Sequence, residues 1–295
     1  MGISIYLQSV IDGLLIGGVY ATIAVGLSLA FGVMRIINWA QGELLMISMF
    51  IAYAIFTHLG LDPYIVMALT AVIMFGVGYL LQKTVISNIL ARESAREPVS
   101  VLLFTSGLGM FLSNGVLALV GSNPFSVITK YSGKMIILGN IFISLPKLIS
   151  FLIALVVTVA LYIFLQRSEM GRAIRATAQN RQVATLMGIN QKKIYCVAFG
   201  LSIALVGVAG GLLMPYYTVS YSIGTTFSFK AFVIVVLGGK GSVLGALIGG
   251  LLVGLIEKLG GLLWTDTYAQ MAVFIVFVLV LLFKPNGLLG DKDDK

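Results

Sequence analysis

The sequence predicts an all-α integral membrane protein, a single polytopic helical domain over residues 1–295 with about eight or nine spans, one of them discontinuous. Apolar residues make up 59% of the chain and charged residues only 10%, whereas soluble proteins carry about 25% charged residues. Apolar runs of roughly 20 residues, the length that crosses a bilayer, recur throughout. Lysine and arginine gather between these runs, which is typical of cytoplasmic loops.

The rare residue types exclude several kinds of site. With one cysteine, Cys196, and one histidine, His58, the chain cannot build a disulfide framework or a Cys/His metal cluster, so no metal site is expected. The net charge of +8 follows mainly from the loops and indicates no nucleic-acid partner. No Walker A motif is present, so any ATP chemistry must come from another chain.

The first apolar run, near Val10–Phe31, is interpreted as a retained span. No lysine or arginine precedes Arg35, so the basic region of a signal peptide is missing, and the run is longer than a signal peptide's apolar core. Because positive charge first appears after this run, we expect the amino terminus to be extracytoplasmic and Arg35 to face the cytoplasm.

Six further uninterrupted spans are expected, on the criterion of length and apolar content. They lie near Trp39–Thr57, Pro63–Gln82, Val99–Val120, Pro146–Leu165, Ile194–Tyr216 and Thr267–Phe283.

Two of the connecting segments have distinct characters. Segment 83–98 carries Lys83, Arg92 and Arg96 and is expected to be a cytoplasmic loop. Segment 121–145 is then extracytoplasmic, and Gly139-Asn140 stands there between two β-prone runs, which predicts a hairpin. This hairpin is either a landing surface for another protein or a lid that packs on the spans beneath.

The segment from Phe227 to Ile256 is too long for one span. A 30-residue helix would be about 45 Å long, against a hydrocarbon core of about 30 Å. The sequence GGKGS at 238–242 is expected to break it into two pieces, each too short to cross squarely, and Lys240 at bilayer depth would cost about 2.5–3.5 kcal/mol. The predicted break and the small-residue face for helix packing comprise Gly238, Gly239, Gly241, Gly245 and Gly249.

Segment 166–193 is the most basic of the connections and has helical character. Ser168 and Asn180 are suited to cap two short helices, and Gly188 is suited to end the second one. On the second helix Val183, Leu186 and Met187 share one apolar face. This apolar stripe either packs against the protein's own helix ends or lies in a groove of a cytosolic partner.

Several motifs together resemble one family of membrane proteins. Gln182-Val183-Ala184, followed after three residues by Gly188, resembles the E-A-A-x-x-x-G coupling loop of ABC importer permeases. The segments GRAIRATAQN with LMGIN, GVMRIINWAQGELLM and VVLGGKGSVLGALIGG are similar to those of the high-affinity branched-chain amino acid permease family, H-type subunit. These segments are spread over most of the chain.

The resemblance implies a bacterial cytoplasmic (inner) membrane permease that is not itself an enzyme and binds no cofactor. ATP and magnesium would be held by two separate cytosolic ATPases, a related second permease would complete a heterodimer, and an extracytoplasmic solute-binding protein would deliver the substrate to the outer surface. Contact with the ATPases would then fall on Arg181, Gln182, Val183, Ala184, Leu186, Met187 and Gly188.

A candidate substrate path comes from polar residues within spans. Asn38, Gln41, Gly42 and Glu43 form a polar start to the second span, and a helix amino terminus is suited to a substrate carboxylate; the alternative is a capping and packing motif. The family motif resembles INFAHGE, and here Trp39 and Gln41 replace its Phe and His. On the fourth span, hydroxyl and amide groups are supplied by Thr105, Ser106 and Asn114.

Two other functions stay open at this point. Importers of urea and short amides look similar to branched-chain amino acid importers. A gradient-driven secondary transporter would need a buried ion-carrying carboxylate, and Asp12 and Glu257 lie near predicted span ends, where solvation at the interface accounts for them. The energy source for uptake, ATP or a proton gradient, separates these classes.

Overall fold

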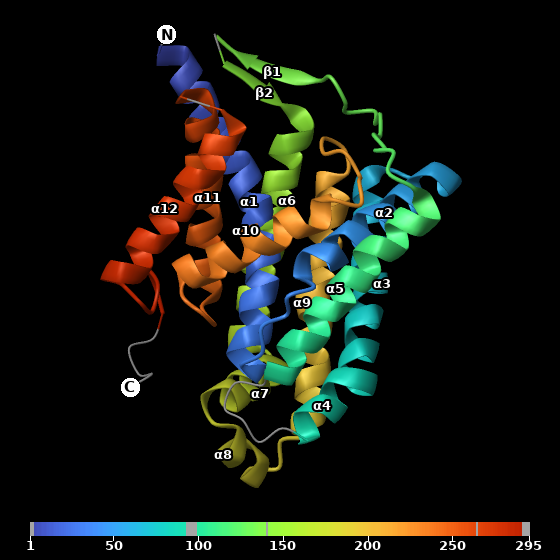
Figure 1. Cartoon of the computed structure of the whole chain (residues 1–295), viewed down its shortest axis with the longest axis vertical. Coiled ribbons are helices and arrows are strands. Elements are labelled where there is room, and N and C mark those ends of the chain that lie inside the picture. Colours follow the sequence, from blue (N-terminus) through green and yellow to red (C-terminus); the bar gives the residue numbers. More distant parts are fainter. Residues whose placement is uncertain (1–2, 93–98, 140, 264, 291–295) are drawn as a thin grey trace.

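The computed structural model describes residues 3–92, 99–139, 141–263 and 265–290, and the described chain is almost entirely helical (Figure 1). Its elements in order are α1 (Ile3–Met34), α2 (Gln41–Leu59), α3 (Pro63–Leu81), the π-helical turn η1 (Gln82–Ile86), α4 (Ser87–Arg92), α5 (Val99–Val120), β1 (Met135–Leu138), β2 (Ile141–Ser144), α6 (Leu145–Arg167), α7 (Glu169–Gln179), α8 (Arg181–Leu186), α9 (Gln191–Leu213), α10 (Ile223–Gly238), α11 (Val243–Leu263) and α12 (Asp266–Phe283).

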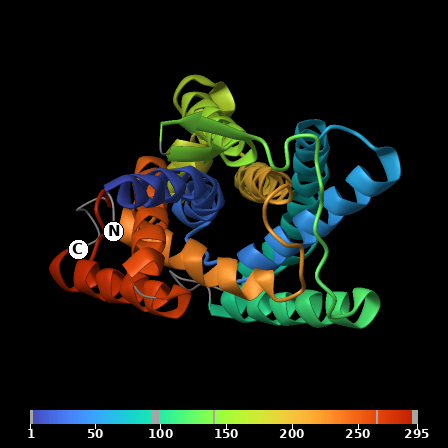
Figure 2. The same ribbon diagram turned by 90° about the horizontal axis from the view of Figure 1, so that it is seen from above.

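The number of apolar helices agrees with a polytopic membrane protein of eight or nine spans. In the described part of the chain, seven helices are long and apolar enough to cross a bilayer, and two shorter apolar helices, Ile223–Gly238 and Thr267–Phe283, accompany them. The first and the sixth of the long helices are the most buried, at 89% and 83% of their apolar window. These two helices, α1 and α9, therefore form the centre, and the others surround them (Figures 1 and 2).

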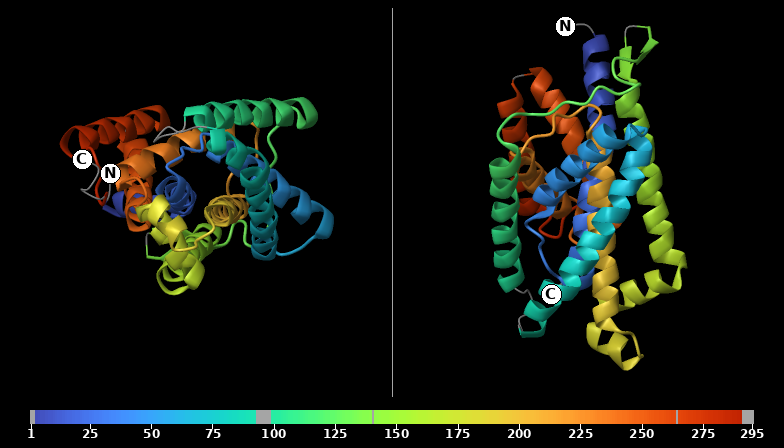
Figure 3. Two further views of the ribbon diagram at one scale, coloured as in Figure 1. Left: turned by 90° about the horizontal axis from the view of Figure 1, so that it is seen from below. Right: turned by 90° about the vertical axis from the view of Figure 1, so that its right-hand side faces the viewer.

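The two ends of the bundle carry different connections. The amino terminus and the β1–β2 hairpin lie at one end, and α4, α7 and α8 lie at the other (Figures 1 and 3). The described part of the first basic segment, residues 83–92, and segment 166–193 are thus on the same side of the molecule, opposite the described residues of segment 121–145. Which end faces the cytoplasm follows only from the positive-inside rule and stays a prediction.

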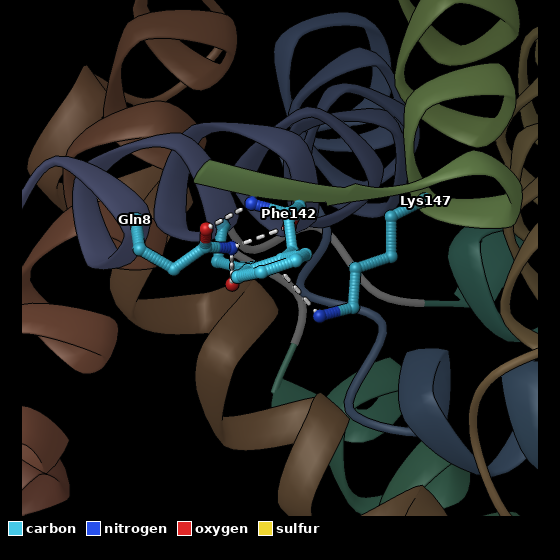
Figure 4. A network of polar contacts seen from close by, with 4 residues as sticks. Gln8, Phe142 and Lys147 are labelled. Carbon is cyan, nitrogen blue, oxygen red and sulfur yellow. Dashed lines mark hydrogen bonds and ion pairs between the residues drawn. The ribbon is translucent and has the colours of Figure 1, made fainter. Parts of the chain in front are cut away.

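The predicted hairpin is confirmed and is held against the bundle. β1 and β2 are antiparallel, with Leu138 opposite Ile141, and Gly139 has a positive φ of 61°; Asn140 lies outside the described residues. The Gln8 side chain both donates to the Phe142 carbonyl (2.7 Å) and accepts from its N–H (2.8 Å), as Figure 4 shows.

An ion pair fixes the same corner of the molecule. Lys147 lies 2.8 Å from Asp12 on α1. Elsewhere in this segment the Tyr131 hydroxyl donates to Asp62, which raises the pKa of Tyr131 because an ionised phenol would face the carboxylate. The hairpin is therefore anchored to α1 and the loop before it to the start of α3.

Segment 83–98 is not a loop throughout, contrary to the prediction. The helix of α3 continues through η1 and α4 as far as Arg92, and Arg96 lies outside the described residues. The reason is local: Gln82–Arg92 contains no glycine or proline to end a helix, and lysine near a span end reaches water by extending its side chain. The hydropathy criterion detects only the apolar part of this helix, so the predicted span ended before the helix does.

The break at GGKGS is confirmed, but its geometry differs from the prediction. Gly239 and Gly241 adopt positive φ values of 106° and 83°, and α10 and α11 then run antiparallel, since Gly238 packs against Gly245 and Gly249 against Ile234. The segment is therefore a tight helical hairpin rather than one interrupted span. The expectation of two short pieces is wrong for α11, which continues to Leu263 and has 21 residues.

Lys240 lies on the exposed turn of this hairpin, with Nζ 5.4 Å from the centre of the Phe31 ring. The turn contacts Gly32, near the end of α1. Lys240 is therefore exposed close to the end of α1, where a lysine side chain can extend towards water.

The close approach of α10 and α11 predicts a position-specific effect of adding one methyl group. In Gly249→Ala the new Cβ would lie 2.8 Å from the Ile234 carbonyl oxygen, and overpacking of this kind costs about 1–3 kcal/mol. In Gly115→Ala on α5 the Cβ would meet nothing within 4 Å, and the better helix propensity of alanine stabilises by up to about 1 kcal/mol. Thermal unfolding of the two purified variants measures this difference; equal shifts for both would contradict the packing.

Candidate functional site

The first turn of α2 lies deep in the bundle, beside the middle of α1. The Gln41 side chain donates to the Ile23 carbonyl (3.4 Å). Along the axis of α1, Ile23 lies roughly 16 Å before the last residue of the helix, Met34. The connection between α1 and α2 therefore turns back into the bundle. It passes through Arg35, a non-glycine residue with a positive φ of 56°.

Each polar side-chain atom of the buried amides at the start of α2 has at least one partner within the protein. Asn38 donates to Gln41 (3.0 Å) and accepts from the Ala40 N–H (3.2 Å), and both amide side chains are about 1% exposed. Buried polar groups need such partners because no water is available in the hydrocarbon region. Asn38 and Gln41 thus fix the connection against α1.

Glu43 is held by α10. Its side chain is 7% exposed, and one carboxylate oxygen accepts from the Ser228 hydroxyl at 2.7 Å, while the other accepts from Thr225 at 3.4 Å. Ser228 also accepts from the Gly42 N–H at 2.9 Å. A carboxylate is stabilised at a helix amino terminus. Glu43 is in the first turn of α2 and therefore places a negative charge of the protein's own at this terminus.

Glycine permits this contact between α2 and α10. A Cβ on Gly42 would collide with the Gly224 carbonyl oxygen, and a Cβ on Gly224 would lie 3.0 Å from the Glu43 Cα. The two backbones therefore approach at a distance that only glycine allows. The sequence-predicted motif at 38–43 is in this respect a packing and capping unit, and its role in a substrate path stays a proposal.

The candidate residues on α5 divide into two groups. Thr105 is buried and accepts from the Trp39 N–H at 3.1 Å, so it belongs to the α2 cluster. Ser106 and Asn114 donate instead to carbonyls of their own helix, those of Leu102 (2.9 Å) and Met110 (2.8 Å). The structure therefore brings Thr105 to the cluster and leaves Ser106 and Asn114 outside it.

A second charged cluster was missed by the sequence analysis. Lys230 in the middle of α10 lies 2.8 Å from the Glu257 carboxylate on α11 and donates to the Tyr20 hydroxyl on α1 at 3.1 Å. The side chains of Lys230 and Glu257 are only 13% and 16% exposed. The available signal was a lysine within an apolar segment, since intramembrane ionisable residues indicate function and call for a partner.

The predicted caps and turn of segment 166–193 are confirmed. The Ser168 hydroxyl accepts from the Gly171 N–H (2.9 Å), and the Asn180 side chain accepts from the N–H groups of Gln182 and Val183. Gly188 has a positive φ of 81°, which favours glycine at the end of a helix.

The apolar stripe on α8 is exposed. The exposed fractions of Val183, Leu186 and Met187 are 52%, 86% and 78%, whereas Ala184 is buried against the protein. The alternative in which the stripe packs on the chain's own helix ends is therefore wrong. Figure 1 shows α8 projecting from the end of the bundle.

Residues 9–282 match the family described as branched-chain amino acid transport system / permease component. The chain belongs to this family. It is 34% identical, over 97% of the chain and 96% of the relative, to the high-affinity branched-chain amino acid transport system permease protein BraD of Pseudomonas aeruginosa. It is 32% identical, over 97% of the chain and 96% of the relative, to the corresponding protein LivH of Escherichia coli K12.

A more distant similarity covers only part of this permease. The ribose import permease protein RbsC of Escherichia coli K12 is 31% identical, but over 44% of the chain and 43% of the relative. In the part of the chain that the structure describes, no group of three or more His, Cys, Asp or Glu side chains could hold a metal ion.

The contact between α2 and α10 yields a graded prediction. Ser228→Ala removes the donor to Glu43 and leaves a buried carboxylate underpaired, which costs about 1–3 kcal/mol, and Gly42→Ala is expected to be more damaging because its Cβ collides with backbone. Ser222→Ala is the control, since Ser222 is exposed and shares only a hydroxyl contact with Ser220. Thermal unfolding of the purified variants gives the order; a Ser228→Ala protein as stable as Ser222→Ala would contradict this role.

Proposed function

We propose that this chain is the membrane-spanning permease subunit of a binding-protein-dependent ABC importer that moves branched-chain aliphatic amino acids into the cytoplasm. The observation that carries the proposal is the similarity, over 97% of the chain, to relatives named as high-affinity branched-chain amino acid permeases. The partial similarity to a ribose permease is weaker support for a sugar.

The exposed α8 supports an energy source outside this chain. Covering an apolar helix face with a partner removes it from water, which lowers the free energy. In the helix-in-groove mode, apolar residues spaced three and four apart on a helix fit into a hydrophobic groove of the partner. The proposed partners at this end are two cytosolic ATPases, which hold ATP and magnesium. Arg181, Gln182 and Gly188 then frame the apolar contact of Val183, Leu186 and Met187.

One face of the bundle is suited to a second permease and to the substrate. Helices α5, α10 and α12 lie along this face (Figures 2 and 3), and the exposed residues of these helices include the polar Asn114, Thr225, Thr226 and Gln270. Exposed polar groups in a membrane-spanning layer are unfavourable against lipid and favourable against water or protein. The proposed path runs between the two permeases along this face and past the Glu43 cluster.

The opposite end is proposed to face outward and to receive the binding protein. Its β1–β2 hairpin lies beside the start of α1 (Figure 1) and exposes Met135 and Phe142. In this orientation the amino terminus is extracytoplasmic, and the arginines of segment 166–193 face the cytoplasm.

The function is tested by uptake into proteoliposomes that contain this permease with its partner permease, ATPases and binding protein. We expect leucine, isoleucine and valine to accumulate only when ATP is supplied to the ATPase side. Excess urea or acetamide should leave the rate unchanged. Uptake that follows a proton gradient without ATP would favour the secondary transporter, and competition by urea would favour the amide importer.

Coupling through α8 gives a second prediction. Leu186→Asp places a charge in the proposed groove, and an uncompensated buried charge costs several kcal/mol. Because Leu186 is 86% exposed in this chain, the variant should reach the membrane at normal levels but lose co-purification of the ATPase and substrate-stimulated hydrolysis. The control is Ile128→Asp, at an equally exposed apolar residue (87%) in segment 121–145. Full transport by Leu186→Asp with a stably bound ATPase would rule out the coupling role.

A further inference from the structure

The Lys230–Glu257 pair lines a cavity that neither the α2 cluster nor α8 accounts for. The cavity has a volume of about 270 Å³ and lies between α10, α11 and α12. Ligand pockets for drug-sized molecules range from about 300 to 1,000 Å³, so this cavity matches a smaller molecule. We propose that it binds the substrate during passage, with Lys230 and Glu257 holding the charged ends of a zwitterionic aliphatic α-amino acid.

This inference rests on the proposed function and adds the residues that recognise the substrate. The charge arrangement is the first argument for it. Lys230 Nζ and the Glu257 carboxylate are 2.8 Å apart, with the Tyr20 hydroxyl 3.1 Å from Nζ. A substrate carboxylate would take the place of one present Lys230 contact, and its ammonium group beside Glu257 would then complete a closed square of alternating charges.

Net charge is the second argument. A single charge in a low-dielectric site is costly, whereas a paired one is tolerated. The Lys230–Glu257 pair is neutral overall and a zwitterion is neutral as well, so the occupied site carries no net charge. An amine or a carboxylic acid that lacks the opposite group would leave one uncompensated charge in the site.

The hydrogen-bonding capacity of the pair is the third argument. An ammonium group has three donors, and a carboxylate has about four acceptor positions. One Glu257 oxygen accepts from both Lys230 and Tyr20, at 2.8 and 3.3 Å. The other oxygen is buried and lies 2.8 Å from Lys230 in the ion pair, without a directed hydrogen bond among the described residues. A substrate ammonium group therefore reaches this oxygen only when the Glu257 side chain turns towards the cavity that it lines.

The remaining wall of the cavity matches an aliphatic side chain. It is mainly apolar, with the two aromatic rings of Phe229 and Phe274 and the three valines Val233, Val253 and Val273. Its polar members besides the ion pair are Thr225, Thr226 and Gln270. A small number of polar groups in an apolar pocket fixes orientation, and the apolar wall selects by size.

The cavity also adjoins the Glu43 cluster. Thr225 lines the cavity and donates to Glu43 at 3.4 Å. A substrate that leaves the cavity along α10 therefore meets the start of α2 next. This continuity places the cavity on the path proposed for the face formed by α5, α10 and α12.

The first arm of the test separates ligand binding from a structural ion pair. Replacement of a buried pair by apolar residues of similar volume is often tolerated, so Lys230→Met with Glu257→Met should assemble at wild-type levels. In the reconstituted importer, ATP-driven leucine uptake by this double variant should fall at least tenfold. Wild-type uptake by an assembled double variant would overturn the proposal and leave the importer function intact, whereas absent uptake by the wild type would overturn the importer function itself.

The second arm measures selectivity and stays informative if the double variant does not fold. Val273→Phe fills the cavity, and Val278→Phe makes the same change at a position on α12 that is 51% exposed. With the binding protein saturated by each amino acid in turn, the ratio of leucine to valine uptake should fall at least threefold in Val273→Phe and stay at the wild-type value in Val278→Phe. An unchanged ratio in Val273→Phe, or an equal change in both variants, would overturn the proposal.

Discussion

The antiparallel contact between α1 and α11 is the constraint on which the arrangement of the other helices depends. Gly13 and Gly17 of α1 face Gly254 and Gly250 of α11, and a Cβ on Gly250 would lie 2.5 Å from the Ala21 Cα. In a bilayer, helices associate through close packing because lipid chains are as apolar as leucine. With α11 against α1 in this way, the turn at 239–242 lies beside Gly32. Helix α10, which precedes this turn, then lies next to Tyr20 of α1.

A second crossing, between α1 and α9, completes the centre. A Cβ on Gly26 would lie 2.6 Å from the Ser202 carbonyl oxygen, so the backbones of α1 and α9 approach closely at this crossing. Against this centre the start of α2 lies at mid-depth, where its backbone and amides have no water. The partners supplied by Ile23, Thr105 and Ser228 satisfy those groups, and the same polar contacts hold α10 at a fixed position relative to α2.

The polar groups of this permease therefore fall into two kinds. Asn38 and Gln41 are satisfied inside the chain and fix the backbone, whereas Thr226 and the Lys230–Glu257 pair line a cavity. At one end of the bundle the exposed apolar residues of α8 stand on a helix whose Ala184 is buried, and α8 contacts α7 and α9.

The sequence by itself determined the properties that depend on neighbours along the chain. Hydropathy located the spans, the arrangement of Lys and Arg grouped 83–98 with 166–193, and cap and turn residues such as Ser168, Asn180 and Gly188 placed the helix ends. These features are local, so no knowledge of packing is needed to recognise them. Glycines at 238–241 likewise indicated where a helix must end.

Only the tertiary structure decided how distant segments meet. Whether the break at 239–242 joins two halves of one span or reverses the chain depends on the fit of Gly245 to Gly238, which spacing does not encode. Glu257 was assigned to an interface because its position in the sequence is near a span end, and Lys230 was overlooked because its partners lie on α11 and α1. The exposure of Leu186 was equally undetermined, since an apolar helical stripe reads the same whether the chain itself or another protein covers it.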